Sequence, residues 1–273
     1  MLRSSNPILS KKDAFTPAAP QYGQPYQSYP GQGGFGGPQD PYSNAPQTVP
    51  GRMTLDDVIT KTAVTIAVLV VTAGLAWNLV PDSLYFPAMV LSAIVGFVVV
   101  LLVSFRRVVS PGLVVLYAAI EGVFIGMISK VYEGFYTGIV AQAVFATFVA
   151  AAVTLAAYKF FNIRVTAKFT KVVFISTAAF AGLLLINFIF SLVTGSGGLR
   201  GGITGPVSPF VYLISAIAIV LAVLNLVLDF DYVERGIEMG APANESWRAA
   251  FGLTVTMVWL YIELLRLISL IRR

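Results

Sequence analysis

The chain has 273 residues, of which 57% are hydrophobic and only 11% are charged, and its mean hydropathy is +0.80. These shares lie far from those of a soluble globular domain and predict an integral membrane protein. The sequence has no Cys, which excludes disulfides and thiolate metal sites, and no His, which excludes the usual zinc ligand and the usual titrating group near neutral pH. Any proton chemistry must therefore use carboxylates.

The net charge of +5 has a membrane explanation. In so apolar a chain, we expect Lys and Arg in loops that face the anionic cytoplasmic leaflet. The partner that this composition predicts is a lipid bilayer and not a nucleic acid.

Residues 1–50 differ in composition from the rest of the chain. They hold most of the fifteen prolines, repeated Gln and Tyr, and the run GQGGFGGPQD, without hydrophobic periodicity. This composition predicts a disordered tail, and the lack of a signal-peptide pattern predicts that the tail stays in the cytoplasm. The tail could be a plain tether or could bind other membrane proteins. We therefore divide the chain into this tail and a membrane domain over residues 51–273.

The membrane domain contains seven apolar runs of about the length that a spanning helix needs, which predicts an all-α bundle. The runs are too long and continuous for the strands of a membrane barrel. A capping box is predicted in TLDD, from Thr54 to Asp57, a turn in VPDS, from Val80 to Ser83, and a flexible loop over Gly195 to Pro206. The expected helices cover residues 60–80, 85–104, 112–130, 137–158, 171–194, 208–230 and 250–270.

The distribution of positive charge predicts the orientation of the bundle. If the amino terminus is cytoplasmic, most of the eighteen Lys and Arg residues fall in cytoplasmic segments. With an odd number of spans, the carboxyl terminus is then expected outside. The expected location is the plasma membrane.

Three acids fall within the predicted spans. They are Glu121 in the third, Asp229 near the cytoplasmic end of the sixth, and Glu263 in the seventh. An ionisable group near the bilayer centre costs at least about 2.5 kcal/mol, so each needs a partner or a watery cavity. Glu121 is a candidate for an ion pathway, and Asp229 and Glu263 are candidates for a gate.

The end of the sixth span carries further polar residues. Asp229 and Asp231 are two positions apart, so they cannot both face the bundle interior. Asn225 lies one turn before Asp229 and shares its face, which favours Asp229 as the inward acid and leaves the role of Asp231 undecided. Asn225 and Asp231 are added to the possible ion pathway. Asn244 is a candidate cap for the seventh helix.

Glu263 has two interpretations. It could pair with Arg266 in its own helix, or approach Asp229 to form a pair of carboxylates that responds to pH and binds Ca²⁺ through hard oxygen ligands. With a turn near residue 242, the two acids differ in height by roughly 12 Å. A non-helical connection reaching to about residue 250 would bring them level.

Four motifs together resemble the transmembrane Bax inhibitor motif family, also called Bax inhibitor-1-like, in its bacterial form. The resemblance covers residue 55 to the carboxyl terminus and leaves the tail outside, although the tail and the opening MLRSSNPILS are similar to actinobacterial members. The motifs are FRR before the third span, INFIF in the fifth, LDFDYVERG at the end of the sixth and WLYIELLRLISLI in the seventh.

The resemblance implies a fold in which a central seventh helix is surrounded by the other six, and a pH-sensitive calcium leak. It places a di-carboxylate sensor on Asp229 and Glu263, and an arginine that latches Asp229 in the closed form on Arg106. The chain departs from the family pattern in three respects: Glu replaces Asp at 263, the connection between the two acids looks longer, and Asp231 adds a carboxylate.

The predicted function is therefore a pH-sensitive cation leak channel, with calcium as the permeant or bound ion and no other cofactor. The alternative is a regulator that binds other membrane proteins, such as a membrane protease. An enzyme is not expected, because Glu263 lacks the neighbouring glycine that intramembrane aspartyl proteases need, and no phosphate-binding loop is present. A proton-coupled transporter finds no support in an internal repeat.

Overall fold

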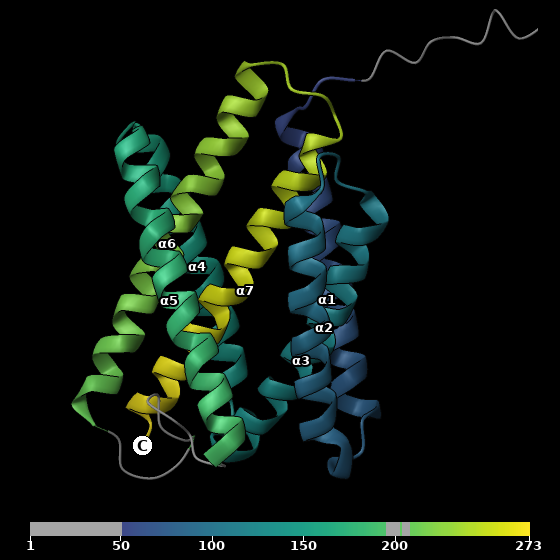
Figure 1. The fold of residues 1–273 in the computed structure, drawn as a ribbon, viewed down its shortest axis with the longest axis vertical. Helices are drawn as coiled ribbons and strands as arrows, with labels where there is room; N and C mark the ends of the chain where they lie inside the picture. The colour runs from purple at the N-terminus through teal and green to yellow at the C-terminus, as the bar shows by residue number, and fades with distance from the viewer. Residues whose placement is uncertain (1–50, 195–202, 204–207) are drawn as a thin grey trace, which may run out of the picture. The chain divides into compact units, whose positions relative to one another are not determined.

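A computed structural model describes residues 51–194, 203 and 208–273, and these residues form an all-helical membrane domain (Figure 1). Seven helices are long and apolar enough to cross a membrane, as predicted. A short 3-10 helix, η1 (Asp82–Leu84), follows α1. The seven helices are α1 (Leu55–Leu79), α2 (Tyr85–Phe105), α3 (Pro111–Phe135), α4 (Ile139–Phe160), α5 (Ala167–Thr194), α6 (Pro209–Glu238) and α7 (Glu245–Ile271).

Several helix boundaries differ from those predicted. α1 begins at Leu55 because the Thr54 hydroxyl accepts a hydrogen bond from the amide of Asp57, 3.2 Å away, so the predicted cap is confirmed. The VPDS turn also forms. α7 begins at Glu245 and not near residue 250, and the side chain of Asn244 does not cap it. The predicted tail lies outside the described residues, as does all of the predicted loop over residues 195–206 except Ile203.

α7 lies at the centre of the domain, as the resemblance implied. It packs against α1, α3, α4 and α6, and Figure 1 shows it crossing between the group α1 to α3 and the group α4 to α6. Its fully buried side chains include Leu260, Glu263, Leu265 and Leu270. Large apolar side chains on the outer helices are exposed, as lipid-facing positions require, for example Val71, Phe97 and Phe174.

α1 and α3 approach each other closely at two glycines. A Cβ at Gly122 would lie 2.5 Å from the carbonyl oxygen of Leu69, and a Cβ at Gly126 would lie 2.4 Å from that of Ala73. Small residues four positions apart let two helix backbones meet, which is a common packing device in membranes. This contact fixes α3 against α1.

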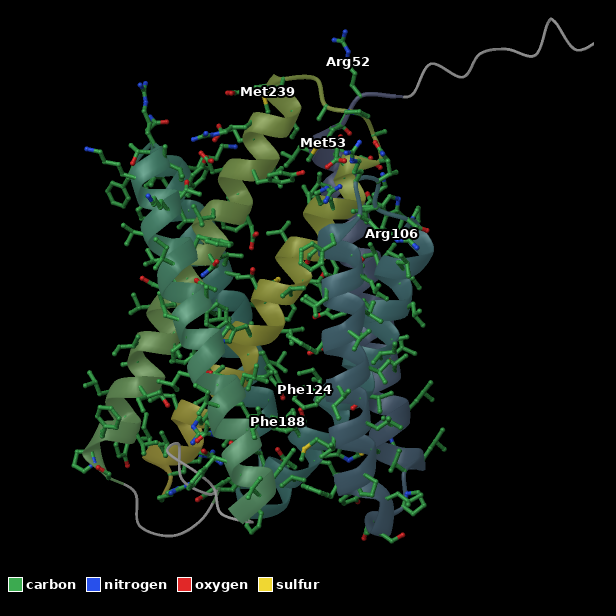
Figure 2. All side chains as sticks on the ribbon, viewed as in Figure 1. Arg52, Met53, Arg106, Phe124, Phe188 and Met239 are labelled. Atoms are coloured by element: carbon green, nitrogen blue, oxygen red, sulfur yellow. The ribbon has the colours of Figure 1, made fainter. Side chains whose placement is uncertain are left out.

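The segment just before α1 is attached to the connection between α6 and α7. The Met53 amide donates to the Ala241 carbonyl, 2.7 Å away, and the Ala243 amide donates to the Gly51 carbonyl, also 2.7 Å away. Met53 is buried against Gly236, near the end of α6 where Figure 2 labels Met239. These bonds hold the beginning of the membrane domain against the α6–α7 connection.

Candidate functional site

Asp229 borders a cavity of about 310 Å³ formed by the end of α2, the last third of α6 and the first turns of α7. Its Oδ2 is buried and has no hydrogen-bond partner among the described residues. The side chain of Thr256 lies within hydrogen-bonding reach of the carboxylate. A buried carboxylate oxygen without a donor is costly, so this group needs a proton or a cation. The cavity is lined by Val103, Ser104, Asp229, Tyr232, Arg248, Ala249, Phe251 and Gly252.

Gly252 and Thr256 bring α7 close to the acid. They are four residues apart and therefore lie on one face of the helix. A Cβ at residue 252 would be 3.3 Å from Asp229 Oδ1. Because Gly252 has no side chain, the Asp229 carboxylate of α6 can pack directly against α7.

Arg248 supplies the guanidinium beside this cavity. Its Nε donates to Glu245 Oε2 at 2.7 Å, and its Nη2 donates to the carbonyl of Arg107 at 2.7 Å. The Tyr232 hydroxyl donates to the same Glu245 oxygen at 2.8 Å. These bonds join the start of α7 to α6 and to the α2–α3 connection.

Arg106, the predicted latch, lies elsewhere. It ends α2 with an exposed side chain, labelled in Figure 2, and its carbonyl accepts a bond from Arg248 Nη2 at 3.2 Å. Within the described part of the chain, Arg106 makes no ion pair with Asp229. The arginine that lines the cavity is Arg248, four residues beyond Asn244, the predicted cap of α7.

Glu263 does not meet Asp229 in this structure. It is 1% exposed, on the same stripe of α7 as Thr256 but two turns further along. At 1.5 Å per residue, that spacing places Glu263 about 10 Å beyond the level of the Asp229 carboxylate. The longer connection that would have brought the acids level is missing, because only residues 239–244 separate α6 from α7.

Asn225 and Asp231 are engaged away from the cavity. The Asn225 amide donates to Thr177 Oγ1 on α5 at 2.7 Å and to the Leu221 carbonyl at 2.8 Å. Asp231 forms an ion pair with Arg235, one turn later, at 2.8 Å. The undecided role of Asp231 is thus that of a salt-bridge partner in this structure.

Glu121 lies at a separate place, between α2 and α3. Its Oε2 would be 3.0 Å from a Cβ at Gly96, so this glycine makes room for the carboxylate. Glu121 does not border the Asp229 cavity. The described residues contain no group of three or more acids that could hold a metal ion, so the proposed calcium contact has at most two carboxylates at any one place.

Sequence reasoning missed the roles of Gly252, Thr256 and Arg248. The first two are neutral, so an argument from the free-energy cost of placing a charge in the membrane does not identify them. Arg248 is one of the Lys and Arg residues that count toward a cytoplasmic segment, and charge distribution gives it no further role. A helical wheel of α7 places Arg248, Gly252 and Thr256 on one stripe, four residues apart, and that spacing could have revealed the cavity wall.

The fold and the site define a multi-pass α-helical membrane protein. Its central helix carries one buried carboxylate, Glu263, and packs against a second, Asp229. A family model described as Bax inhibitor 1 like matches residues 6–273, and the chain belongs to that family. The match begins within residues 1–50, so the expectation that the tail lies outside the resemblance is wrong. No curated protein matches the chain.

Proposed function

We propose that this protein is a pH-sensitive cation leak channel, with calcium as a permeant ion and Asp229 at the gate. The observation that carries the proposal is the buried Oδ2 of Asp229, which borders a cavity and has no hydrogen-bond donor among the described residues. When the carboxylate is charged, it attracts a cation into the cavity. When it is protonated, that attraction is lost. A transport function, and not an enzymatic one, follows from this use of the acid.

Arg248 is the counter-ion in this proposal. Tyr232 and Arg248 are the other titratable or charged side chains that line the cavity, and α2 contributes only Val103 and Ser104. The guanidinium is bonded to Glu245, so it acts on Asp229 across the cavity, and a cation that enters weakens this attraction. Arg248 therefore has the part that the family resemblance gives to Arg106.

Glu263 acts as a second, separate point on the path. It shares a stripe of α7 with Thr256 and lies about 10 Å further along the helix. At that distance, the two carboxylates do not share a proton directly, but they can hold a permeating ion in turn. The orientation in the proposal has the amino terminus in the cytoplasm and the carboxyl terminus outside the plasma membrane.

The test is calcium flux into liposomes that contain the purified full chain. The wild type should leak with a rate that depends on pH, and Asp229→Asn should remove this dependence. Asp231→Asn is the matched control, because it makes the same change two residues away in a group that is paired with Arg235. A wild-type protein without flux, or an Asp229→Asn variant with an unchanged pH profile, would refute the proposal.

A partner-regulated role is the second candidate, and the attachment of Met53 favours it. The segment that follows residues 1–50 is bonded to the α6–α7 connection, which joins the two helices around Asp229. A membrane protein that binds the tail could pull on this connection. Deletion of residues 1–50 should then abolish capture of the partner while the leak remains.

A further inference from the structure

A second cavity, which the proposed channel does not use, is a groove between α1 and α4. Its volume is about 460 Å³, within the range of small-molecule sites. α1 and α4 do not contact each other, and α3 and α7, which pack against both, form the floor. Val70, Val144 and Phe148 on its rim are exposed. The groove therefore opens sideways, toward the hydrocarbon of the bilayer.

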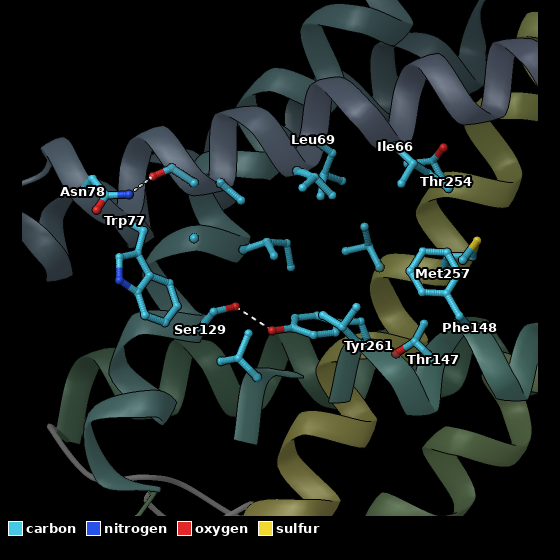
Figure 3. A pocket seen from close by; sticks show the side chains of 18 residues that line it. Ile66, Leu69, Trp77, Asn78, Ser129, Thr147, Phe148, Thr254, Met257 and Tyr261 are labelled. Carbon is cyan, nitrogen blue, oxygen red and sulfur yellow. Dashed lines mark hydrogen bonds between the residues drawn. The ribbon is translucent and has the colours of Figure 1, made fainter. Parts of the chain in front are cut away.

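Five of the six polar side chains that line the groove, all but Trp77, make a hydrogen bond within the described residues. Figure 3 shows the bond between Ser129 and Tyr261, 2.6 Å long, on the floor. The other bonds run to backbone carbonyls one turn earlier: Asn78 to Gly74 at 2.7 Å, Thr147 to Ala143 at 2.7 Å, and Thr254 to Ala250 at 2.8 Å. Because most of the lining is apolar and the buried hydroxyls of the floor are paired, the groove favours an apolar occupant over water or a polar solute.

The groove has the length and position of one leaflet. It runs from Ile66, near the middle of α1, to Asn78 at the end of the same helix. Twelve residues of helix cover about 18 Å, and half of a hydrocarbon core is about 15 Å. A single acyl chain is the abundant apolar molecule of that length, whereas a helix about 10 Å wide needs more room than this volume gives.

One end of the groove is suited to a lipid headgroup. Trp77 and Asn78 lie there, at the end of α1, as Figure 3 shows. Lys130 is next to Ser129 of the lining, and its Nζ donates to the Trp77 carbonyl at 2.8 Å. The Lys130 ammonium also lies 3.8 Å from Asp82 Oδ1 and 4.3 Å from the centroid of the Tyr85 ring, so its charge is already engaged. Tryptophan is a typical residue of the headgroup region, and the exposed amide of Asn78 can hydrogen-bond to a headgroup.

From these features we infer that the groove binds one phospholipid, with an acyl chain between α1 and α4 and the headgroup at the end that Trp77 and Asn78 line. The site is independent of the Asp229 cavity. Its occupation fills the gap between α1 and α4 and so supports the packing of both helices on α7.

Native mass spectrometry of the full chain in mild detergent tests this inference. Gly74→Phe fills the groove, because Gly74 lines it and no atom lies within 4 Å of the place of a Cβ there. Gly182→Phe is the matched control, since Gly182 of α5 has equally open surroundings but lies outside the groove. We expect the wild type and Gly182→Phe to retain one phospholipid, and Gly74→Phe to retain at least about tenfold less. Equal retention in all three, or a bound free fatty acid in place of a phospholipid, would overturn the inference.

If Gly74→Phe does not fold, the wild type alone can decide. A phospholipid with a photoactivatable group on its acyl chain is mixed with unlabelled phospholipid in liposomes that hold the full chain. Labelling of Met257 and Tyr261, on the floor of the groove, is the expected result. Labelling confined to outward side chains such as Val172 and Phe174 of α5, which any surrounding lipid reaches, would contradict it.

Discussion

Asp229 of α6 and Gly252 of α7 are in contact, and a Cβ at residue 252 would be 3.3 Å from Asp229 Oδ1. That distance is tighter than most real contacts of a Cβ, so a methyl group could fit only if the carboxylate moved by a few tenths of an ångström. The place of the acid in its cavity therefore depends on a residue that has no side chain.

Gly252→Ala is expected to move the carboxylate away from Thr256 and to shift the pH midpoint of the calcium leak. The cost in folding stability should be small, about 1 kcal/mol, because only one side chain must adjust. Flux into liposomes at several pH values measures the midpoint. Gly134→Ala is the control, since that glycine of α3 has no atom within 4 Å of the place of a Cβ. An identical pH profile for Gly252→Ala would show that contact with α7 does not tune Asp229.

Arg248→Gln should raise the leak at neutral pH by about fivefold, the effect of removing about 1 kcal/mol of attraction between a guanidinium and the gate. Arg106→Gln, at an exposed position, should leave it unchanged. In an Asp229→Asn background, Arg248→Gln should have no further effect on the flux, which separates a role at the gate from the loss of the bonds to Glu245 and Arg107. A rise with Arg106→Gln alone would restore that residue as the latch.

Glu263→Gln should lower the calcium flux while the pH midpoint set by Asp229 stays in place, because the two acids are about two helical turns apart. The measurement is the same flux assay over the same range of pH. If both acids instead form one unit, Glu263→Gln and Asp229→Asn should change the midpoint equally, and the double variant should resemble either single one. That result would require the two helices to slide relative to this structure.

The sequence predicted the number of helices well and the site only in part. Seven apolar runs are unambiguous, because each must satisfy its own backbone in lipid. Helix ends are harder to predict. α6 continues beyond the apolar run to Glu238, because the Tyr158 hydroxyl donates to Glu234 and Arg235 donates to the Val165 carbonyl. Neither contact could be predicted from local sequence. The partners of Asp229 depend on the height at which α6 crosses α7, and a single sequence does not encode that height locally.

Tyr261→Phe should destabilise the domain by about 1 to 3 kcal/mol, because it leaves the buried hydroxyl of Ser129 without its hydrogen-bond partner. This bond joins α3, which carries Ser129, to α7, which carries Tyr261. Ser129→Ala should do the same to the hydroxyl of Tyr261. The double variant, which removes both groups, should lose less than the sum of the two. Thermal unfolding in detergent gives the three values, and strict additivity would mean that the bond contributes nothing.

Gly126→Ala should destabilise the domain more than Gly252→Ala, because the atoms that oppose the new Cβ belong to the backbone and cannot rotate away. A Cβ at residue 126 would lie 2.4 Å from the Ala73 carbonyl oxygen and 3.0 Å from the Ala73 Cα, so α1 and α3 must separate. Overpacking of this kind costs about 1 to 3 kcal/mol. Since Gly126 and Ala73 both line the groove between α1 and α4, the separation should also reduce retention of phospholipid, whereas Gly134→Ala on the same helix should change neither quantity. Unfolding temperature and native mass spectrometry on the two variants measure both effects, and an unchanged Gly126→Ala would mean that α1 and α3 are further apart than described.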